Sequence, residues 1–192
     1  MQKSNIHRLF MSGTPGFSKR CMMLLCVVAV VVGCALRTSA QIEEHEAKAA
    51  FVLKLVNFVE WPAAAGQGSL VIGIVGADET SDALQKLATG KSVNGKQLVV
   101  KRLGSDADVS SCQVLYIGSS QGKNLASLLD KTRNANVLTV GEAEGFGQRG
   151  GIVNLLVSEG RIKFEVNPHA AERAHLQISS RLLSLATIVN GG

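Results

Sequence analysis

Acidic residues are absent from the first 40 positions of this sequence, although the whole chain of 192 residues carries 15 of them. The same stretch holds five basic residues: Lys3, Arg8, Lys19, Arg20 and Arg37. The formal net charge of +5 therefore belongs to residues 1–40, and the remainder is neutral, with 15 basic and 15 acidic side chains. A neutral domain offers no excess positive charge to neutralise phosphates, so we expect no nucleic-acid partner.

Aromatic residues are also scarce, at 4% of the chain, with one tryptophan, Trp61, and one tyrosine, Tyr116. So few rings exclude a stacking platform for single-stranded nucleic acid. Trp61 is predicted to plug the core at the end of the first helix, because aromatic side chains contribute mainly buried area. A ligand platform at Trp61 is the alternative.

Cysteine is scarce as well, since three of the four cysteines lie within residues 1–40. Cys112 alone remains for the rest of the chain, and one cysteine cannot make an internal disulfide. The domain is therefore predicted to depend on its apolar core, to which Cys112 contributes a small buried side chain. A reactive thiol or an intermolecular bridge is the alternative, and no adjacent His or Lys favours it.

Residues 1–40 have the three zones of a secretory signal peptide. A basic segment ends at Arg20, sixteen apolar residues cover positions 21–36, and small residues lead to Ala40. Sixteen residues are fewer than the roughly 20 of a spanning helix. Cleavage after Ala40 is predicted, with export of a domain over residues 41–192 that starts at Gln41. Lipidation of Cys34 and retention of the run as an anchor stay open, and Met11 is a second candidate start.

The rest of the chain alternates between helical and strand patterns. Helical periodicity covers residues 42–60, 81–89 and 123–133, and short strand-like runs cover 70–75, 97–103, 113–117 and 136–140. Residues 93–95 are predicted to form a turn before the second of these runs. Two further runs, 152–157 and 161–166, predict a β-hairpin, and a helical tail is expected from Asn167-Pro168. This order predicts a single three-layer α/β domain with a mostly parallel central sheet, helices on both faces and a C-terminal antiparallel hairpin.

One motif suggests an enzyme. Residues 118–122 (GSSQG) fit G-x-S-x-G between a predicted strand and helix, which is the context of a nucleophile elbow. A serine esterase using Ser120 would need an acid and a histidine, for which Asp130, Glu142, His169 and His175 are available. However, Asp130 lies in the very next predicted helix, and the chain is short for such a hydrolase. A strand-to-helix turn with serine as N-cap is the favoured interpretation, so we expect no catalytic residue.

The same turn is a candidate anion site, because helix-start amides attract negative charge. No P-loop lysine and no G-x-G-x-x-G accompany it, so no nucleotide cofactor is expected. A metal site is equally unsupported by the histidines after residue 40: His45, His169 and His175. His169 and His175 are six residues apart, which on a helix points them to different faces. Glu172 shares a face with either, but two ligands do not make a site.

Several segments together resemble YfiR-like proteins. The opening segment runs from residues 46–51 (EAKAAF) to 57–62 (NFVEWP). The others, in the family's order, are 112–117 (CQVLYI), 137–140 (VLTV) with Gly145-Phe146, 150–152 (GGI), 163–167 (KFEVN) and 176–186 (LQISSRLLSLA). The resemblance covers nearly all of residues 41–192.

The resemblance implies a periplasmic α/β domain that is often dimeric and has no enzymatic activity. The best-studied YfiR-like proteins restrain an inner-membrane diguanylate cyclase by binding its periplasmic part, which links cyclic di-GMP synthesis and biofilm formation to an envelope signal. An inner-membrane sensor, either a diguanylate cyclase or a histidine kinase, is therefore the expected partner. The matched segments are mostly core and turn positions and nominate no partner-binding surface.

One departure from the family concerns cysteine pairs. Better-known members carry paired cysteines, whereas Gly73 stands where a partner of Cys112 is expected, and residues 145–151 contain none. Redox control through disulfides is therefore not expected. A second class of function is an extracytoplasmic small-ligand-binding module, with the ligand held at the carboxyl ends of strands near residues 118–122 and 141–151.

Overall fold

The computed structural model describes residues 43–62 and 68–191. The expectations for the leader, including Met11, Cys34 and cleavage after Ala40, concern residues outside these ranges. Among the described residues, no helix combines the length and apolar character needed to cross a membrane.

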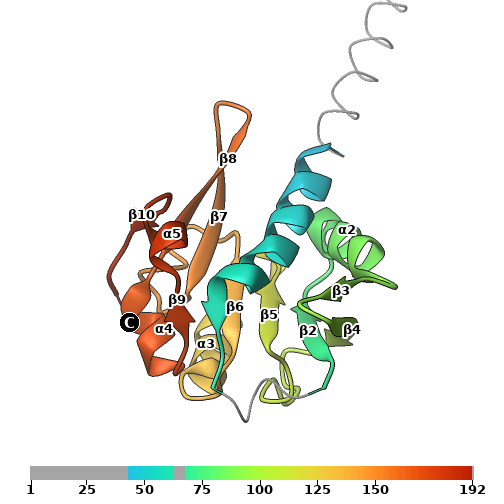
Figure 1. Ribbon diagram of the computed structural model, residues 1–192. Coiled ribbons are helices and arrows are strands. Elements are labelled where there is room, and N and C mark those ends of the chain that lie inside the picture. The colour runs from blue at the N-terminus through green and yellow to red at the C-terminus, as the bar shows by residue number, and fades with distance from the viewer. Residues whose placement is uncertain (1–42, 63–67, 192) are drawn as a thin grey trace, which may run out of the picture. The chain divides into compact units, whose positions relative to one another are not determined.

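A mixed sheet of eight strands forms the middle layer, in the order β10-β8-β7-β6-β5-β2-β4-β3 (Figure 1). The strands are β2 (Leu70–Val75), β3 (Ser92–Val93), β4 (Lys96–Leu103), β5 (Val114–Ile117), β6 (Leu138–Gly141), β7 (Val153–Ser158), β8 (Arg161–Val166) and β10 (Thr187–Ile188). All neighbours are parallel except the pairs β7–β8 and β3–β4. The predicted parallel sheet with a C-terminal antiparallel hairpin is therefore confirmed.

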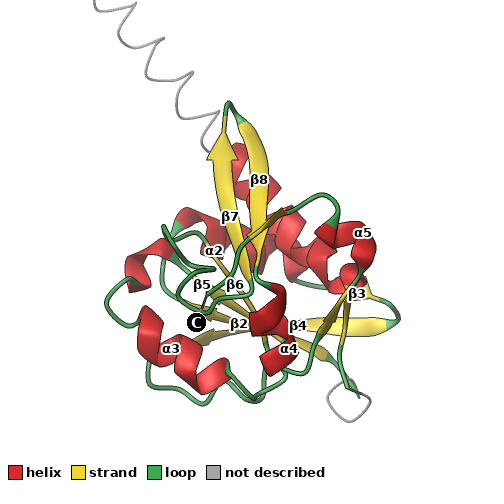
Figure 2. Ribbon diagram, turned by 90° about the vertical axis from the view of Figure 1, so that its left-hand side faces the viewer, coloured by secondary structure: helices red, strands yellow, loops and turns green. Residues whose placement is uncertain are grey.

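Helices cover both faces of this sheet, as predicted (Figure 2). The first helix (residues 43–55) and α2 (Glu79–Ala88) pack on one face, where Val52 and Leu84 share a buried cluster with Ile72 of β2. Helix α3 (Leu125–Thr132) packs on the other face, where Leu128 and Val75 belong to a second buried cluster. Alternate residues of the central strands thus enter two separate apolar layers.

The first helix ends earlier than its periodicity predicts. It stops at residue 55 and continues as a 3-10 turn, η1 (Val56–Phe58), and a short strand, β1 (Val59–Glu60). Strand β1 pairs antiparallel with β9 (Gln177–Ile178) in a separate two-stranded sheet. The prediction of helix up to Glu60 was wrong because Pro62 disfavours helical backbone before it and β9 supplies hydrogen-bond partners to an extended chain.

The expected helical tail is also broken into short pieces. Asn167 caps α4 (Pro168–Arg173) by accepting from the amide of Ala170, and Ser179 caps α5 (Ser180–Leu183) in the same way. Between them His175 adopts a positive φ of 55°, which ends the first piece and lets β9 form. The tail is therefore a helix, a strand, a helix and the edge strand β10.

Two turns form as the sequence predicts. Asn94-Gly95 joins β3 to β4, and Glu159-Gly160 joins β7 to β8. All four residues have positive φ, between 51° and 76°. Positive φ at both central positions is the requirement of a type I′ hairpin turn, which asparagine and glycine satisfy readily.

Candidate functional site

The carboxyl ends of β2, β5 and β6 meet at one edge of the sheet. After β2 the chain turns to α2 on one face, whereas after β5 it turns to α3 on the opposite face. The crevice between β2 and β5 is therefore a topological switch point, the usual ligand position in open α/β sheets. It is also the place of the three hypotheses raised by the sequence: a catalytic serine, which was not favoured, an anion site and a small-ligand site.

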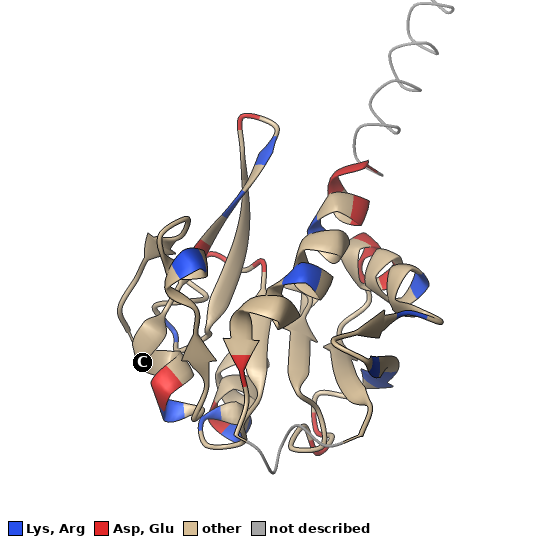
Figure 3. Ribbon diagram, viewed as in Figure 1, with Lys and Arg blue, Asp and Glu red and all other residues tan. Residues whose placement is uncertain are grey.

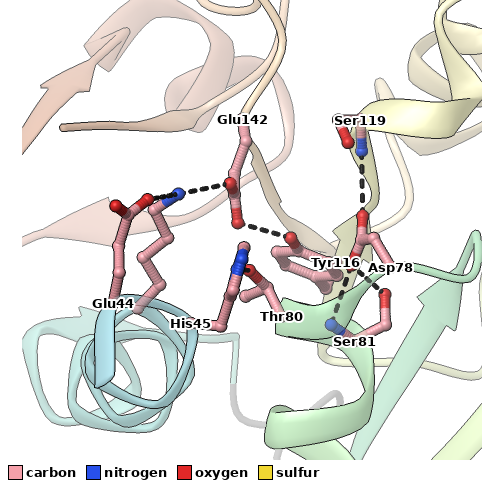
Figure 4. Close-up of polar contacts among 9 residues, drawn as sticks. Glu44, His45, Asp78, Thr80, Ser81, Tyr116, Ser119 and Glu142 are labelled. Carbon is pink, nitrogen blue, oxygen red and sulfur yellow. Dashed lines mark hydrogen bonds and ion pairs between the residues drawn. The ribbon is translucent and has the colours of Figure 1, made fainter. Parts of the chain in front are cut away.

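The carboxylate of Asp78 fills this switch point (Figure 4). One oxygen, Oδ1, accepts from the amide of Ser81 at 2.8 Å and from the Ser81 hydroxyl at 2.7 Å. The other, Oδ2, accepts from the amide of Ser119 at 3.1 Å. Gly118 permits this approach, because a Cβ at that position would lie 2.3 Å from Oδ2. Asp78 thus N-caps α2 and bonds the loop after β5 at the same time.

This arrangement corrects the interpretation of residues 118–122. They do form a strand-to-helix turn, with η3 (Ser119–Gln121) after β5, but the N-cap is Gly118 and no side chain caps this 3-10 helix. A serine N-cap was therefore the wrong prediction. The predicted anion position is real in one respect, since the Ser119 amide binds a carboxylate, but that carboxylate is the chain's own Asp78.

A second set of polar groups lies beside Asp78 and is largely buried (Figure 4). The Glu142 carboxylate, directly after β6, accepts from the Tyr116 hydroxyl at 2.6 Å and from Lys48 Nζ at 2.8 Å. Lys48 also pairs with Glu44, one turn earlier in the first helix, at 2.8 Å. Tyr116 is fully buried, and the side chains of Lys48 and Glu142 are only 9% and 13% exposed.

The burial of these groups changes their proton affinities. Burial alone would lower the pKa of Lys48, but hydrogen bonds to Glu142 and Glu44 outweigh it and raise that pKa. Burial, together with the Glu142 carboxylate, also raises the pKa of Tyr116 far above its ordinary value. Lys48 therefore stays charged and Tyr116 stays a neutral donor at physiological pH.

Further contacts tie the first helix to α2. His45 Nδ1 and Thr80 Oγ1 share a hydrogen bond of 2.8 Å, and Lys86 pairs with Glu46 at 3.2 Å. Together with Lys48, these contacts fasten the first helix over the carboxyl ends of β5 and β6. The site consists of internal contacts between structural elements.

The residues of the esterase hypothesis are not brought together. Ser120 lies in η3, and no histidine or acid hydrogen-bonds it within the described part of the chain. Asp130 pairs with Arg133 in the last turn of α3, and Glu142 binds Tyr116 and Lys48. The two candidate histidines lie elsewhere: His169 sits 3.5 Å from Glu172 on α4, and His175 follows that helix.

The sequence argument against a metal site placed His169 and His175 on one helix. His169 and Glu172 do share a face of α4, as predicted. The helix ends at Arg173, however, so the comparison of faces does not apply to His175. Across residues 43–62 and 68–191, no group of three or more His, Cys, Asp or Glu side chains lies close enough to hold a metal ion.

Cys112 is fully buried, whereas Trp61 is only partly buried. Cys112 is 1% exposed, as predicted, and burial raises the pKa of its thiol. Trp61 packs against the core but stays half-buried, and its ring nitrogen donates to the carbonyl of Gln113 at 3.2 Å. Trp61 also borders a hollow of about 340 Å³ at the amino ends of β2 and β4, beside Leu70 and Lys96.

The sequence interpretation missed Asp78 and Lys48, although each had a signal. Asp78 follows a predicted strand and immediately precedes a helix, which is the preferred place of an aspartate N-cap. Lys48 lies four residues before Val52 in the first helix, on the apolar stripe that faces the core. A charged residue on such a stripe requires a buried partner.

Comparisons with known proteins found a matching family and a solved structure with a similar fold. The family model described as YfiR/HmsC-like matches residues 45–187. A crystal structure of a conserved domain protein from Vibrio cholerae aligns with a TM-score of 0.53 at 16% identity, covering 75% of this chain and 59% of that one. At this identity the likeness concerns the fold alone, and the chain spans less than two thirds of that structure. No curated protein matches the chain.

Proposed function

Because the chain belongs to the YfiR/HmsC-like family, we propose that it is an exported regulator without enzymatic activity that docks on a membrane sensor. The family is one of periplasmic regulators. We propose a diguanylate cyclase as the sensor, restrained in its synthesis of cyclic di-GMP until an envelope signal releases it. A histidine kinase is the alternative sensor.

This proposal rests on the hydrogen bonds that the side chains at the switch point make within the chain. Asp78 binds the helix-start amide that would otherwise face a ligand, and Glu142 is held by Tyr116 and Lys48. Side chains that a hydrolase would direct at a substrate are thus used for internal contacts. A domain built in this way acts through its outer surface, which is what docking on a receptor requires.

The leader supports the proposed location. Residues 1–40 carry the basic, apolar and small-residue zones of an export signal. The rest of the chain carries no excess charge, and acidic and basic positions are interspersed over the described elements (Figure 3). We propose that the domain works in the periplasm, next to the sensor's extracytoplasmic part.

Deletion of the gene tests the regulator and its target together. We expect cyclic di-GMP to rise in the deletion strain, and to return to the parental level when the full chain is restored. A chain lacking residues 2–40 is the matched control and should not restore it, because it stays in the cytoplasm. Cross-linking of an epitope-tagged full chain, followed by mass spectrometry, should capture a membrane protein with a cyclase domain. Unchanged cyclic di-GMP with no captured membrane protein would contradict the proposal.

Two further measurements separate the alternatives. Capture of a membrane kinase with unchanged cyclic di-GMP would keep the docking proposal and replace the cyclase. For the esterase, Ser120→Ala should leave every hydrolytic activity of the purified chain unchanged. A thermal-shift screen with amino acids and nucleotides tests the small-ligand module, and stabilisation by one compound would favour a ligand-controlled regulator.

A further inference from the structure

Strand β4 lies next to the edge of the central sheet, and most of it has a neighbouring strand on one side only (Figure 1). On the inner side, β2 pairs with it along residues 98–103. On the outer side, β3 pairs with Lys96 and Gln97 alone. Within the described part of the chain, no strand pairs with residues 99–103 on that outer side. An open stretch of sheet edge therefore follows the β3–β4 hairpin.

The backbone of this open stretch offers hydrogen-bond groups to a further strand. The Leu98 amide points away from β2, because it donates to the Lys91 carbonyl at 2.9 Å. Backbone groups alternate in direction along a strand, so the amides and carbonyls of Val100 and Arg102 point outward as well. Neither residue's backbone bonds another described segment on this outer side. Unpaired edge groups of this kind are a template for an added strand.

This edge is basic, although residues 41–192 as a whole are neutral. Residues 91–103 contain no acidic side chain and four basic ones: Lys91, Lys96, Lys101 and Arg102. Arg102 is partly compensated, since its guanidinium donates to Asp82 and Gln85 of α2. Lys101 is exposed, and it forms no ion pair with a described residue. The open stretch therefore carries an uncompensated positive charge beside its outward amides.

The charges at this edge disfavour a second copy of the chain as its partner. If two β4 strands paired antiparallel around Lys101 or Arg102, like charges would lie directly opposite each other, which destabilises a sheet. Lysine on an exposed edge strand is a recurrent protection against pairing between copies. The same positive charges favour an extended segment that carries carboxylates, because complementary charges select the partner and its register.

We propose that an acidic, extended segment of a partner protein adds a strand to the sheet along the outer side of β4. Its backbone pairs with the outward groups of Val100 and Arg102, which supplies affinity. Its carboxylates lie opposite Lys101, which supplies specificity. The identity of the partner, the membrane sensor, rests on the proposed function. Strand addition itself does not, and it is tested without the sensor.

Titration of the purified full chain with a short synthetic peptide tests the edge. The probe alternates valine and glutamate, and the control peptide has lysine in place of each glutamate. Bound probe should slow the exchange of the Val100 and Arg102 amide hydrogens, measured by NMR. Exchange at Val99 and Lys101 should not change, because their amides already face β2. Equal binding of the lysine peptide, or no slowing at Val100 and Arg102, would overturn the proposal.

Charge reversal at Lys101 tests the specificity of the edge. Lys101→Glu should weaken binding of the glutamate peptide about tenfold, because an attractive cross-strand pair becomes repulsive. Lys163→Glu is the matched control, since Lys163 is an exposed lysine of β8, several strands away in the same sheet. It should bind the peptide as the wild type does. Equal affinities of the two variants would count against the proposal.

Val100→Pro tests the backbone pairing, because proline removes one outward amide hydrogen and is tolerated on edge strands. Circular dichroism shows whether this variant is folded; if it is not, Lys101→Glu takes its place in the same assays. In the deletion strain it should neither lower cyclic di-GMP nor capture the membrane protein. If it does both, another surface docks on the sensor and the edge proposal is wrong, although the regulator stands.

The remaining outcomes separate this inference from the proposed function. Peptide binding by the wild type supports the edge even if deletion of the gene leaves cyclic di-GMP unchanged, which would refute the regulator alone. Sedimentation of the full chain tests the second copy as the occupant. A dimer that Val100→Pro converts to a monomer would assign the edge to that copy and overturn the proposal.

Discussion

A Cβ atom built at Gly73 would lie 2.8 Å from the Sγ atom of Cys112. Gly73 is in β2, opposite Leu115 of β5, and Cys112 lies two residues before β5 begins. The separation suits a half-cystine, whose Cβ sits close to the sulfur of its partner. Gly73 therefore occupies the position where the family resemblance placed a partner for Cys112.

We expect Gly73→Cys to form a disulfide with Cys112 in an oxidising buffer. The bond would close a loop of roughly 40 residues, which by chain entropy stabilises a domain by about 4 kcal/mol. Crowding against Leu103 and Leu115, at 2.8 and 3.1 Å from the new Cβ, reduces this gain. Thiol counting by mass spectrometry and thermal melting with and without reductant measure both effects.

Gly73→Ala is the control for that crowding. It adds the same Cβ without the bond, and overpacking of this kind costs about 1–3 kcal/mol. Two free thiols in oxidised Gly73→Cys would show that the strands do not bring these positions together.

The sequence was most informative where a pattern is local. The run LVIGIV predicted β2 at Leu70–Val75 with its observed bounds, because a short β-branched segment between turns has few other uses. The hairpin at Glu159-Gly160 was equally local. By contrast, β1 forms because Val59 meets Ile178, far along the chain. The sequence of residues 42–60 gives no sign of a partner so far away, so the helix was predicted to be too long.

The same distinction applies to the site. The motif around Ser120 is local and was easily found, but its meaning depends on Asp78, which belongs to the preceding strand-to-helix connection. Similarly, Lys48 has a local partner in Glu44, but its more buried partner, Glu142, is brought to it from the end of β6 only by folding. The sequence predicted that a site would lie at the carboxyl ends of the strands, but tertiary contacts determine which groups meet there.

Lys48→Met should strongly destabilise the domain. Removing one partner of a buried ion pair costs about 3–5 kcal/mol, because the other charge is left without compensation. Glu142, at 13% side-chain exposure, would be that charge. Chemical denaturation gives the free energy of unfolding, and adding Glu142→Gln to the variant should recover part of the loss.

Lys86→Met is the matched control for this pair. Lys86 binds Glu46 with 75% and 44% of the two side chains exposed, and exposed pairs contribute about 0–1 kcal/mol. Equal losses for Lys48→Met and Lys86→Met would show that the Glu142 contacts do not stabilise the fold.

Stability should fall at alkaline pH, and Tyr116 should account for part of the fall. The folded state raises the pKa of Tyr116 above its ordinary value of 10.0, so the unfolded state loses this proton first. The stabilisation is complete below about pH 10 and is lost above it, by about 1.4 kcal/mol per pH unit for one proton. The free energy of unfolding between pH 9 and 11.5, by urea titration, measures this slope.

Tyr116→Phe should make that slope shallower, because phenylalanine does not titrate. The raised pKa of Lys48 acts in the same direction, since its contribution is present below its ordinary pKa of 10.5 and is lost at higher pH. Some alkaline loss should therefore remain in Tyr116→Phe. A slope identical to that of the wild type would mean that Tyr116 titrates equally in both states.

Asp78→Ala should loosen both loops at the switch point. The change removes the acceptor of the Ser81 amide and hydroxyl and of the Ser119 amide. Loss of an aspartate N-cap alone costs about 0.5–2 kcal/mol. We expect a loss at or above the top of that range, together with faster amide hydrogen exchange at Ser119, measured by NMR.

Glu79→Ala is the control, because Glu79 is an exposed acid of the same first turn. It shares the favourable helix-dipole interaction of Asp78 but has no hydrogen bond to residues 118–122 in the part of the chain that the structure describes. If the Ser119 amide hydrogen exchanged no faster in Asp78→Ala than in Glu79→Ala, the Asp78 carboxylate would not be holding the two loops together. The switch point would then be available to a ligand, and the small-ligand module would become the better account of this domain.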